Sequence, residues 1–306
     1  MLPIVAAIVA STAAGVWAEH RYRGRAGLAA RRSMLAVLYL VFPPVVFFNI
    51  ARAEVSLDAG AGIGLAFVSL GLLAATAWIV ARRLLRLRRP GVGSFVNAAI
   101  APNTGYLGYP VVAALLGFDA LSEAAAYDVL VSSPVLLLGV FAVGAAFGER
   151  AGEGVRERAL AFVTRNPPLY AAIAGLLAPD ALAPDVLVDA SRIAIMAVLP
   201  LGFFAVGAVL AEEAVDGRIG FPPPLDAPVA SVVALRLVAG PALLFALAAP
   251  LIDLPDTYLL LAAMPTGLNT MIVAHAYGLD LRIAAGAIAW STAIAVAVLA
   301  LAAAFT

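Results

Sequence analysis

Long apolar segments, separated by short polar ones, are the feature that most constrains how this chain can fold. The apolar runs cover residues 2–18, 33–51, 60–81, 94–117, 122–147, 167–178, 187–211, 227–250, 258–277 and 282–304. A helix needs about 20 apolar residues to cross a bilayer, and it must satisfy its own backbone hydrogen bonds in lipid. The runs therefore predict an all-α polytopic membrane protein with ten transmembrane helices, embedded in a lipid bilayer.

The composition excludes several other classes of protein. Charged residues make up 12% of the 306 residues, whereas soluble domains carry roughly 25%. A soluble enzyme or a nucleic-acid-binding protein is therefore not expected. The chain has no Cys, which rules out disulfides and thiolate metal ligands. It also has no Lys, and without Lys it cannot form the usual phosphate-binding loop of an ATP-driven pump.

The distribution of Arg predicts the orientation in the membrane. Of the 19 basic residues, all Arg, the loops after the first, third, fifth, seventh and ninth runs hold 16. The opposite side holds only Arg52 and Arg192, and Arg236 lies within the eighth run. Positive loops face the cytoplasm. The first run is not expected to be a signal peptide, because a signal peptide has basic residues before its apolar run and this run has none. We therefore expect a plasma-membrane protein with both termini extracellular.

Several features recur five runs later in the chain. Phe42–Phe48 (FPPVVFF) corresponds to Leu199–Phe204 (LPLGFF), and the hydroxyl pair Ser132 and Ser133 corresponds to Ser291 and Thr292. Because five is odd, the second copy must insert with opposite topology, as in the inverted repeats of secondary transporters. The predicted domains are a first five-helix repeat at 1–147, a cytoplasmic connector at 148–166 and a second, inverted repeat at 167–306.

Pro and Gly interrupt the fourth and ninth runs at corresponding places. The residues expected to break these helices are Pro102, Gly105, Gly108, Pro110, Pro265 and Gly267. A break frees backbone groups that lipid cannot satisfy, so it must face protein or a wet cavity. The free N–H groups of half-helix N-termini attract anions. We predict a substrate site there, with the side chains of Asn103, Thr104, Asn269 and Thr270. The alternative is a pair of kinked helices in which these side chains only repair the backbone.

Other polar residues within the runs are further candidates. Tyr106 lies inside the first break, where its hydroxyl needs a partner. Ser132, Ser133, Ser291 and Thr292 either line the pocket or hold helices together. Asp128 and His275 are candidates for ion coupling, with an ordinary interfacial position as the alternative. We expect Arg236 to snorkel to the cytoplasmic face, the alternative being attraction of the anion. No cofactor or metal site is expected.

Three motifs carry a resemblance to a known family. Pro102–Pro110 (PNTGYLGYP), Met264–Thr270 (MPTGLNT) and Ala274–Asp280 (AHAYGLD) resemble the auxin efflux carrier family, which includes malate and malonate permeases. The resemblance implies a fold like that of bile-acid symporters, with the interrupted helices 4 and 9 crossed at the site. It also implies a scaffold of helices 1, 2, 6 and 7 that pairs into a homodimer, and an elevator-like transport domain of helices 3–5 and 8–10.

Two features depart from the plant members of that family. The long hydrophilic loop of the plant carriers is missing, and residues 60–81 contain no charged side chain, although plant carriers place an acid and a base in the third helix.

The predicted function is secondary transport of a small organic anion, a carboxylate or an auxin-like molecule. The alternative is a channel or receptor that uses the same helices without alternating access. Proton coupling, sodium coupling and uniport all remain open.

Overall fold

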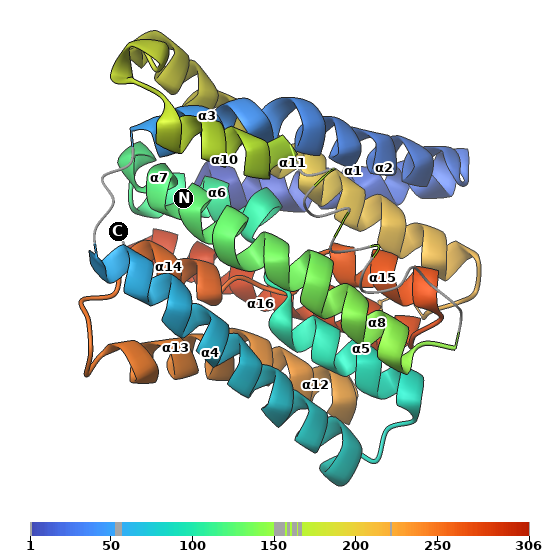
Figure 1. The fold of residues 1–306 in the computed structure, drawn as a ribbon. Coiled ribbons are helices and arrows are strands. Elements are labelled where there is room, and N and C mark those ends of the chain that lie inside the picture. The colour runs from blue at the N-terminus through green and yellow to red at the C-terminus, as the bar shows by residue number, and fades with distance from the viewer. Residues whose placement is uncertain are drawn as a thin grey trace.

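The computed structural model describes residues 2–52, 57–149, 167–220 and 222–305, together with the single residues 157, 160 and 164. Over these residues the chain is helical, with no strand beyond one isolated bridge. The α-helices are α1 (Leu2–Tyr22), α2 (Arg25–Ala36), α3 (Phe42–Ala51), α4 (Leu57–Ile79), α5 (Arg89–Ile100), α6 (Tyr109–Leu115), α7 (Leu121–Tyr127), α8 (Phe141–Phe147), α10 (Pro167–Leu177), α11 (Asp185–Val215), α12 (Ala227–Ala234), α13 (Gly240–Ala248), α14 (Asp256–Ala262), α15 (Asn269–Tyr277) and α16 (Leu281–Phe305) (Figure 1). The all-α prediction is confirmed.

Short segments of wider or tighter helix join several of these α-helices into longer rods. The π-helical segments are η1 (Val37–Val41), η2 (Val80–Leu84), η3 (Thr104–Gly108), η5 (Asp128–Ser132), η6 (Val135–Val140) and η8 (Leu235–Ala239), and the 3₁₀ turns are η4 (Phe118–Ala120) and η7 (Asp180–Leu182). Such π-bulges occur often at functional sites. Here η3 lies in the predicted fourth span, which is interrupted, and the other π-helical segments lie in four of the long helical rods.

Six helical rods within the described residues are long and apolar enough to cross a membrane. They are Arg25–Ala51, Ala59–Leu84, Phe118–Phe147, Asp185–Val215, Ala227–Ala248 and Leu281–Leu301. The predicted fourth and ninth spans are each divided into two shorter helices, and Pro167–Leu177 is a shorter apolar helix. Ten spanning helices therefore stay a prediction. Most of the predicted connector, 148–166, lies outside the described residues.

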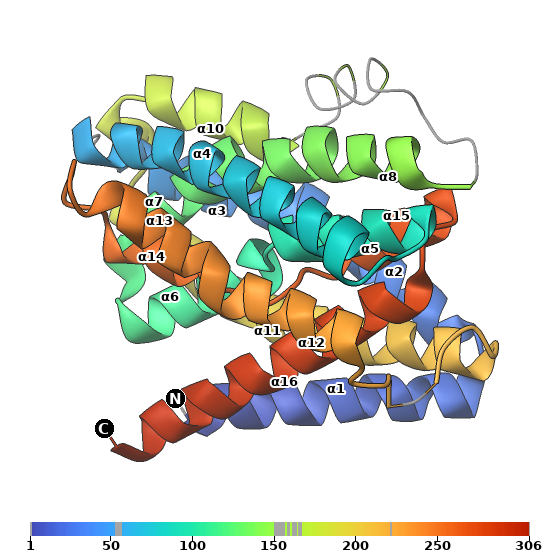
Figure 2. The ribbon, with the colours of Figure 1, turned by 90° about the horizontal axis from the view of Figure 1, so that it is seen from below.

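Helices from the two predicted repeats mix in the arrangement of the bundle. In the view of Figure 1, α1, α2, α3, α10 and α11 lie together along the upper side, and α4, α12 and α13 lie along the lower side. Helix α11 packs on α1, α2 and α3, and α10 packs on α3. From below, α16 also runs beside α1 (Figure 2). Segments far apart in sequence thus form each side of the bundle.

Small residues allow α1 and α11 to approach closely. A Cβ atom built on Gly15 would lie 2.2 Å from the carbonyl oxygen of Phe204, and one on Gly207 would lie 2.1 Å from that of Thr12. Two helices in lipid gain little from burying apolar side chains, so close backbone packing of small residues is a main source of their association. This reciprocal contact fixes α11 against α1.

A buried carboxylate shapes the turn between α1 and α2. Glu19 is 1% exposed, and its side chain accepts hydrogen bonds from the backbone N–H groups of Gly24 and Gly27 at the start of α2. These N–H groups have no partner within the helix, and a negative charge at a helix N-terminus is favourable. Glu19 thus offsets the cost of its own burial by capping α2.

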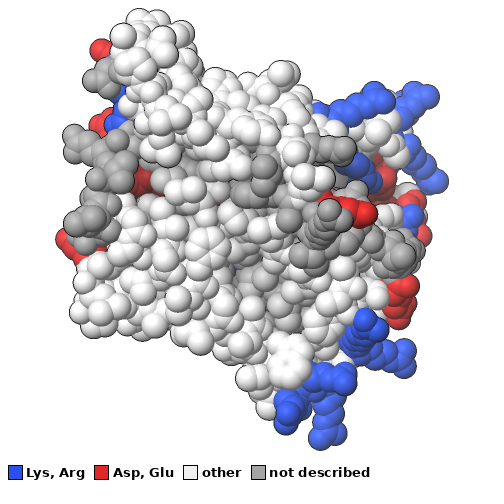
Figure 3. Space-filling view, in the orientation of Figure 1, with Lys and Arg blue, Asp and Glu red and all other residues white. Residues whose placement is uncertain are grey.

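Charge is distributed unevenly between the two ends of the bundle. In Figure 3 the Arg side chains gather at the right-hand end, where α2 begins and α4 ends, whereas Figure 1 places both chain termini at the opposite end. The two Arg residues assigned to the other side are both paired with carboxylates: Arg52 lies 2.8 Å from Asp185, and Arg192 lies 3.0 Å from Asp119. Among the described residues, the Arg side chains without an ion pair therefore concentrate at one end, and the orientation in the membrane stays a prediction.

The contact between α1 and α11 gives a stability prediction with internal controls. Gly15→Ala and Gly207→Ala should each lower the thermal unfolding temperature in detergent, because overpacking costs about 1–3 kcal/mol. Gly64→Ala and Gly71→Ala in α4 meet nothing within 4 Å. They should leave the unfolding temperature unchanged or raise it, because Ala favours helix by roughly 1 kcal/mol over Gly. Equal effects in both pairs would contradict the packing described for α1 and α11.

Candidate functional site

The two interrupted segments hydrogen-bond to each other. After α5 ends at Ile100 and α14 ends at Ala262, the chain becomes extended, and Pro102 and Thr266 form an antiparallel bridge. The N–H of Asn103 donates to the carbonyl of Pro265 at 2.7 Å, and the N–H of Gly267 donates to that of Ala101 at 2.8 Å. Each break thus satisfies backbone groups that the other leaves free.

Local sequence explains why both helices stop here. A residue that precedes Pro is disfavoured in the α conformation, and Ala101, before Pro102, is extended with φ −106° and ψ 89°. Gly267 lets the two backbones come together, because a Cβ there would lie 3.2 Å from the carbonyl oxygen of Pro102. Pro and Gly therefore act together, one ending the helix and the other permitting the bridge.

Hydroxyl groups fix the extended segment of the second break. Thr266, which is fully buried, donates from Oγ1 to the carbonyl of Ala98 at 2.9 Å. The N–H of Thr266 donates to Oγ of Ser291 at 3.0 Å, and Ser291 donates in turn to the carbonyl of Ala287. Ser291 therefore holds the break in place. Thr266 was not among the residues predicted from the sequence, although it lies directly after Pro265 in the MPTG motif.

Arg236 corrects one expectation from the sequence. It does not snorkel: the side chain is 0% exposed. Its Nη1 donates to the carbonyl of Ala99 at 2.8 Å, and its Nη2 donates to the carbonyl of Ala262. These carbonyls belong to the last turns of α5 and α14, the helices that end at the two breaks. Snorkelling was expected from depth alone, but two free helix ends offer the guanidinium better partners than the interface does.

The helices that begin after the breaks open onto a cavity of about 250 Å³. Its polar lining comes from Asn103, Thr104, Tyr106, Asp128, Ser132, Ser133 and Asn269. The first N–H groups of a helix have no partner within it, and the lining includes the start of η3 and the start of α15. The cavity therefore brings two helix N-termini together with hydroxyl and amide side chains.

One carboxylate faces this cavity. Asp128, at the start of η5, accepts a hydrogen bond from the hydroxyl of Thr104, which lies just after the first break. The described residues that line the cavity include no basic side chain. Asp128 is therefore linked directly to the interrupted segment, and its role in ion coupling stays a prediction.

The cavity lies between the two groups of helices. Leu38 and Phe42 contribute to its wall from η1 and α3, and Pro168 contributes from α10. The Tyr106 hydroxyl reaches the carbonyl of Met34 in α2 at 3.4 Å. These apolar wall residues could not be predicted from the sequence, because nothing in a run of Leu, Phe and Pro distinguishes a cavity wall from a lipid-facing surface.

Other predicted residues lie outside the cavity lining. Of the residues predicted to break the helices, the lining includes Pro102, Gly105 and Gly267. The predicted residues that the lining does not include are Thr270, Ser291, Thr292, Gly108, Pro110, Pro265 and His275. Thr270 donates to the carbonyl of Gly267 at 2.8 Å, which reinforces the start of α15. Thr292 is buried, with its hydroxyl close to no hydrogen-bond partner in the described part of the chain.

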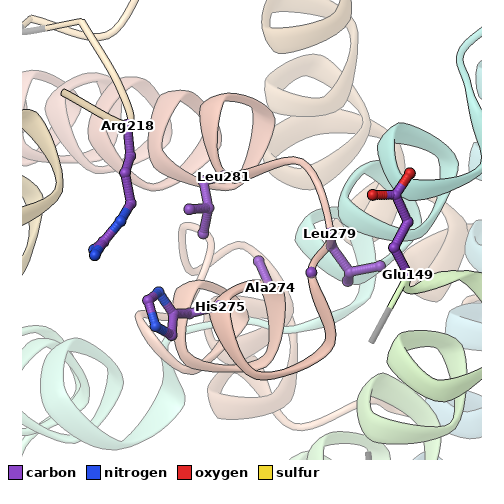
Figure 4. A pocket seen from close by; sticks show the side chains of 7 residues that line it. Glu149, Arg218, Ala274, His275, Leu279 and Leu281 are labelled. Carbon is purple, nitrogen blue, oxygen red and sulfur yellow. The ribbon is translucent and has the colours of Figure 1, made fainter. Parts of the chain in front are cut away.

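His275 lines a second cavity, of about 430 Å³, at the Arg-rich end (Figure 4). Its Nδ1 lies 3.4 Å from the buried carboxylate of Glu213 on α11. Arg218 lies 2.9 Å from the same carboxylate, and its hydrogen bond with Glu213 raises the pKa of Arg218 above its ordinary value. The two candidates for ion coupling, Asp128 and His275, therefore do not share a site.

Comparison with known proteins points to membrane transport. The model of a family described as membrane transport protein matches residues 156–302. The chain is also similar to a protein of Methanocaldococcus jannaschii named uncharacterized transporter MJ1031, with 24% identity over 280 residues that cover 87% of this chain and 86% of the relative. Both comparisons agree with the resemblance indicated by the PNTGYLGYP and MPTGLNT motifs, and the family model covers the second of these motifs. This chain is therefore a multi-span membrane protein that is similar to membrane transport proteins.

Proposed function

We propose that this protein is a secondary transporter of a small organic anion, bound where the two interrupted segments meet. The observation that carries the proposal is that the helices following both breaks begin at one cavity. Discontinuous helices at corresponding positions of two repeats are typical of transporter binding sites. A volume of about 250 Å³ lies just below the usual range of about 300–1,000 Å³ for ligand pockets, which favours a small substrate.

Electrostatics favours an anionic group at the helix starts. Each helix N-terminus carries roughly half a positive charge, and the segments beginning at Thr104 and Asn269 both contribute to the lining. The side chains of Asn103 and Asn269 add amide donors beside these two helix starts. A carboxylate can thus be held by dipoles and neutral donors, without a basic side chain in the lining.

Asp128 gives this anion site a means of coupling to protons. Two like charges about 6 Å apart repel each other by roughly 3 kcal/mol at an effective dielectric constant of about 20. An anion therefore binds better when Asp128 is protonated, and by reciprocity the bound anion favours the protonated carboxyl. Proton-coupled movement of the anion follows from this linkage without a metal ion.

The proposal includes an elevator movement of one group of helices against the other. Under it, the chain forms ten spans in two inverted repeats, α1–α3, α10 and α11 form the scaffold, and the remaining helices carry the site. The cavity wall supports this division, because Leu38, Phe42 and Pro168 come from the scaffold side and Asn103, Asp128 and Asn269 come from the other. Pairing of two scaffolds into a homodimer in the plasma membrane remains a prediction.

Transport in proteoliposomes tests the function. We expect saturable uptake of one or more small mono- or dicarboxylates, with acceleration by unlabelled anion on the opposite side. Asn103→Ala and Asn269→Ala should each weaken binding about 10- to 100-fold, because a hydrogen bond to a charged group contributes roughly 1.5–3 kcal/mol. Thr76→Ala is the matched control, since Thr76 lies on an exposed face of α4 and away from the cavity.

Other outcomes of this experiment have distinct meanings. Flux that rises linearly with concentration and shows no countertransport would favour a channel over a transporter. If both Asn variants bind and transport the anion as the parent does, the anion site lies elsewhere. Selective uptake of amines instead of carboxylates would reverse the proposed sign of the substrate, with Asp128 as its partner.

The role of Asp128 predicts a specific pH response. Anion binding by the wild type should strengthen as the pH falls, and an inward proton gradient should drive accumulation. Asp128→Asn should bind the anion with little pH dependence and exchange it across the membrane, but should no longer accumulate it. Asp119→Asn, at an exposed position of η4, serves as the control. A variant at Asp128 that still accumulates anion with the proton gradient would exclude this carboxyl as the coupling group.

The topology can be tested with single thiols, because the chain has no Cys. Cys at Asp253, which is exposed in the segment between α13 and α14, should react with a membrane-impermeant reagent in intact cells. Cys at Arg88, which is exposed in the Arg-rich loop before α5, should react only after the cells are opened. The reverse labelling pattern would place the termini in the cytoplasm.

A further inference from the structure

Arg236 is a buried cation whose partners are backbone carbonyls. The side chain is 0% exposed, and within the described residues no carboxylate lies within ion-pair distance of it. Its two Nη atoms bond to the carbonyls of Ala99 and Ala262. An isolated charge in the membrane interior costs several kcal/mol, so these two contacts must compensate for most of that cost.

The two helix ends supply a matching negative charge. A helix C-terminus carries roughly half a negative charge. The C-terminal ends of α5 and α14 both lie against the guanidinium of Arg236. Together the two ends provide about one negative charge, which balances a single guanidinium. Arg236 is therefore neutralised by two dipoles that come from different halves of the chain.

Local structure around Arg236 makes room for the guanidinium. Arg236 lies in the π-helical segment η8, which ends at Ala239, and Gly240 is the next residue after that segment. A Cβ on Gly240 would lie 2.9 Å from Nη2 of Arg236 and 3.4 Å from its Cζ. A larger residue at 240 would displace the charged group, so the helix is adapted to hold the side chain where it lies.

We propose that Arg236 is a tethered cation that fills a monovalent-cation site between the carbonyl ends of α5 and α14. Half-helix carbonyl ends in transporters coordinate Na⁺, and here a guanidinium occupies that place permanently. The wild-type protein therefore needs no Na⁺ at this position. Removing the guanidinium turns the two carbonyl ends into a site for a mobile cation. The proposal bears on the coupling ion of the transporter proposed above, but it is tested without any transported substrate.

Ion-specific thermal stability tests the proposal. Unfolding of wild type, Arg236→Ala and Arg236→Lys is followed in detergent with Na⁺, Li⁺, K⁺ or choline chloride at equal ionic strength. Wild type should unfold at the same temperature with Na⁺ and with choline. Arg236→Ala should unfold at a lower temperature in choline and recover by a few degrees, saturably, with Na⁺ or Li⁺, because a ligand of the folded state raises its stability. Arg236→Lys keeps the charge and should respond to no cation.

Two controls separate the proposed site from other effects. Asp128→Asn combined with Arg236→Ala should keep the Na⁺ response; loss of the response would show that Na⁺ binds at Asp128, which overturns the proposal. Arg192→Ala removes a positive charge on the side of the bundle opposite the Arg-rich end, away from the helix ends at Arg236, and should create no Na⁺ response.

Three further results also overturn the proposal. They are a specific Na⁺ response in wild type, a folded Arg236→Ala protein without one, and an Arg236→Lys protein that gains one. If Arg236→Ala does not fold, Arg236→Gln takes its place. If neither folds, the wild-type and Arg236→Lys measurements decide. Because no substrate is needed, failure here leaves the proposed anion transport untouched, and failure of transport leaves this result standing.

Discussion

The need to satisfy backbone groups inside an apolar bilayer governs the centre of this protein. Two interrupted helices release N–H and C=O groups for which lipid offers no partners. The bridge between Pro102 and Thr266 pairs some of these groups across the two halves of the chain. The hydroxyls of Thr266 and Ser291 and the guanidinium of Arg236 take others. Each break is stable only because the other break lies against it.

This pairing separates the two kinds of helix end. The carbonyl ends of α5 and α14 converge on Arg236, whereas the starts of η3 and α15 converge on the cavity with Asp128. Opposite partial charges therefore accumulate on opposite sides of a few residues of extended chain. A continuous helix could not produce this arrangement, because its ends lie at the two membrane surfaces.

The sequence contained enough information to predict the helical class and the location of both breaks. Apolar periodicity and the Pro and Gly residues act locally, so they can be recognised without knowing what packs against them. The partners of Arg236 could not be predicted in this way, because Ala99 and Ala262 contribute only carbonyl oxygens and lie far from it in sequence. Ser291 was selected for its depth, but whether it lines a cavity or holds a backbone segment depends on the angle at which α16 passes the break.

A fixed positive charge and a titratable negative one thus lie on either side of the bridge, and they have different tasks. The guanidinium of Arg236 stays charged at any physiological pH in an ordinary setting, and its contacts with two helix ends hold both breaks in one geometry. The carboxyl of Asp128 can exchange a proton, and its link to Thr104 ties that exchange to the segment that follows the first break. A site that must release its ligand on both sides of a membrane needs a rigid frame and one group whose charge can change. Under the proposed function, those two requirements fall on separate residues of this protein, Arg236 and Asp128, which lie on opposite sides of the bridge between the two breaks.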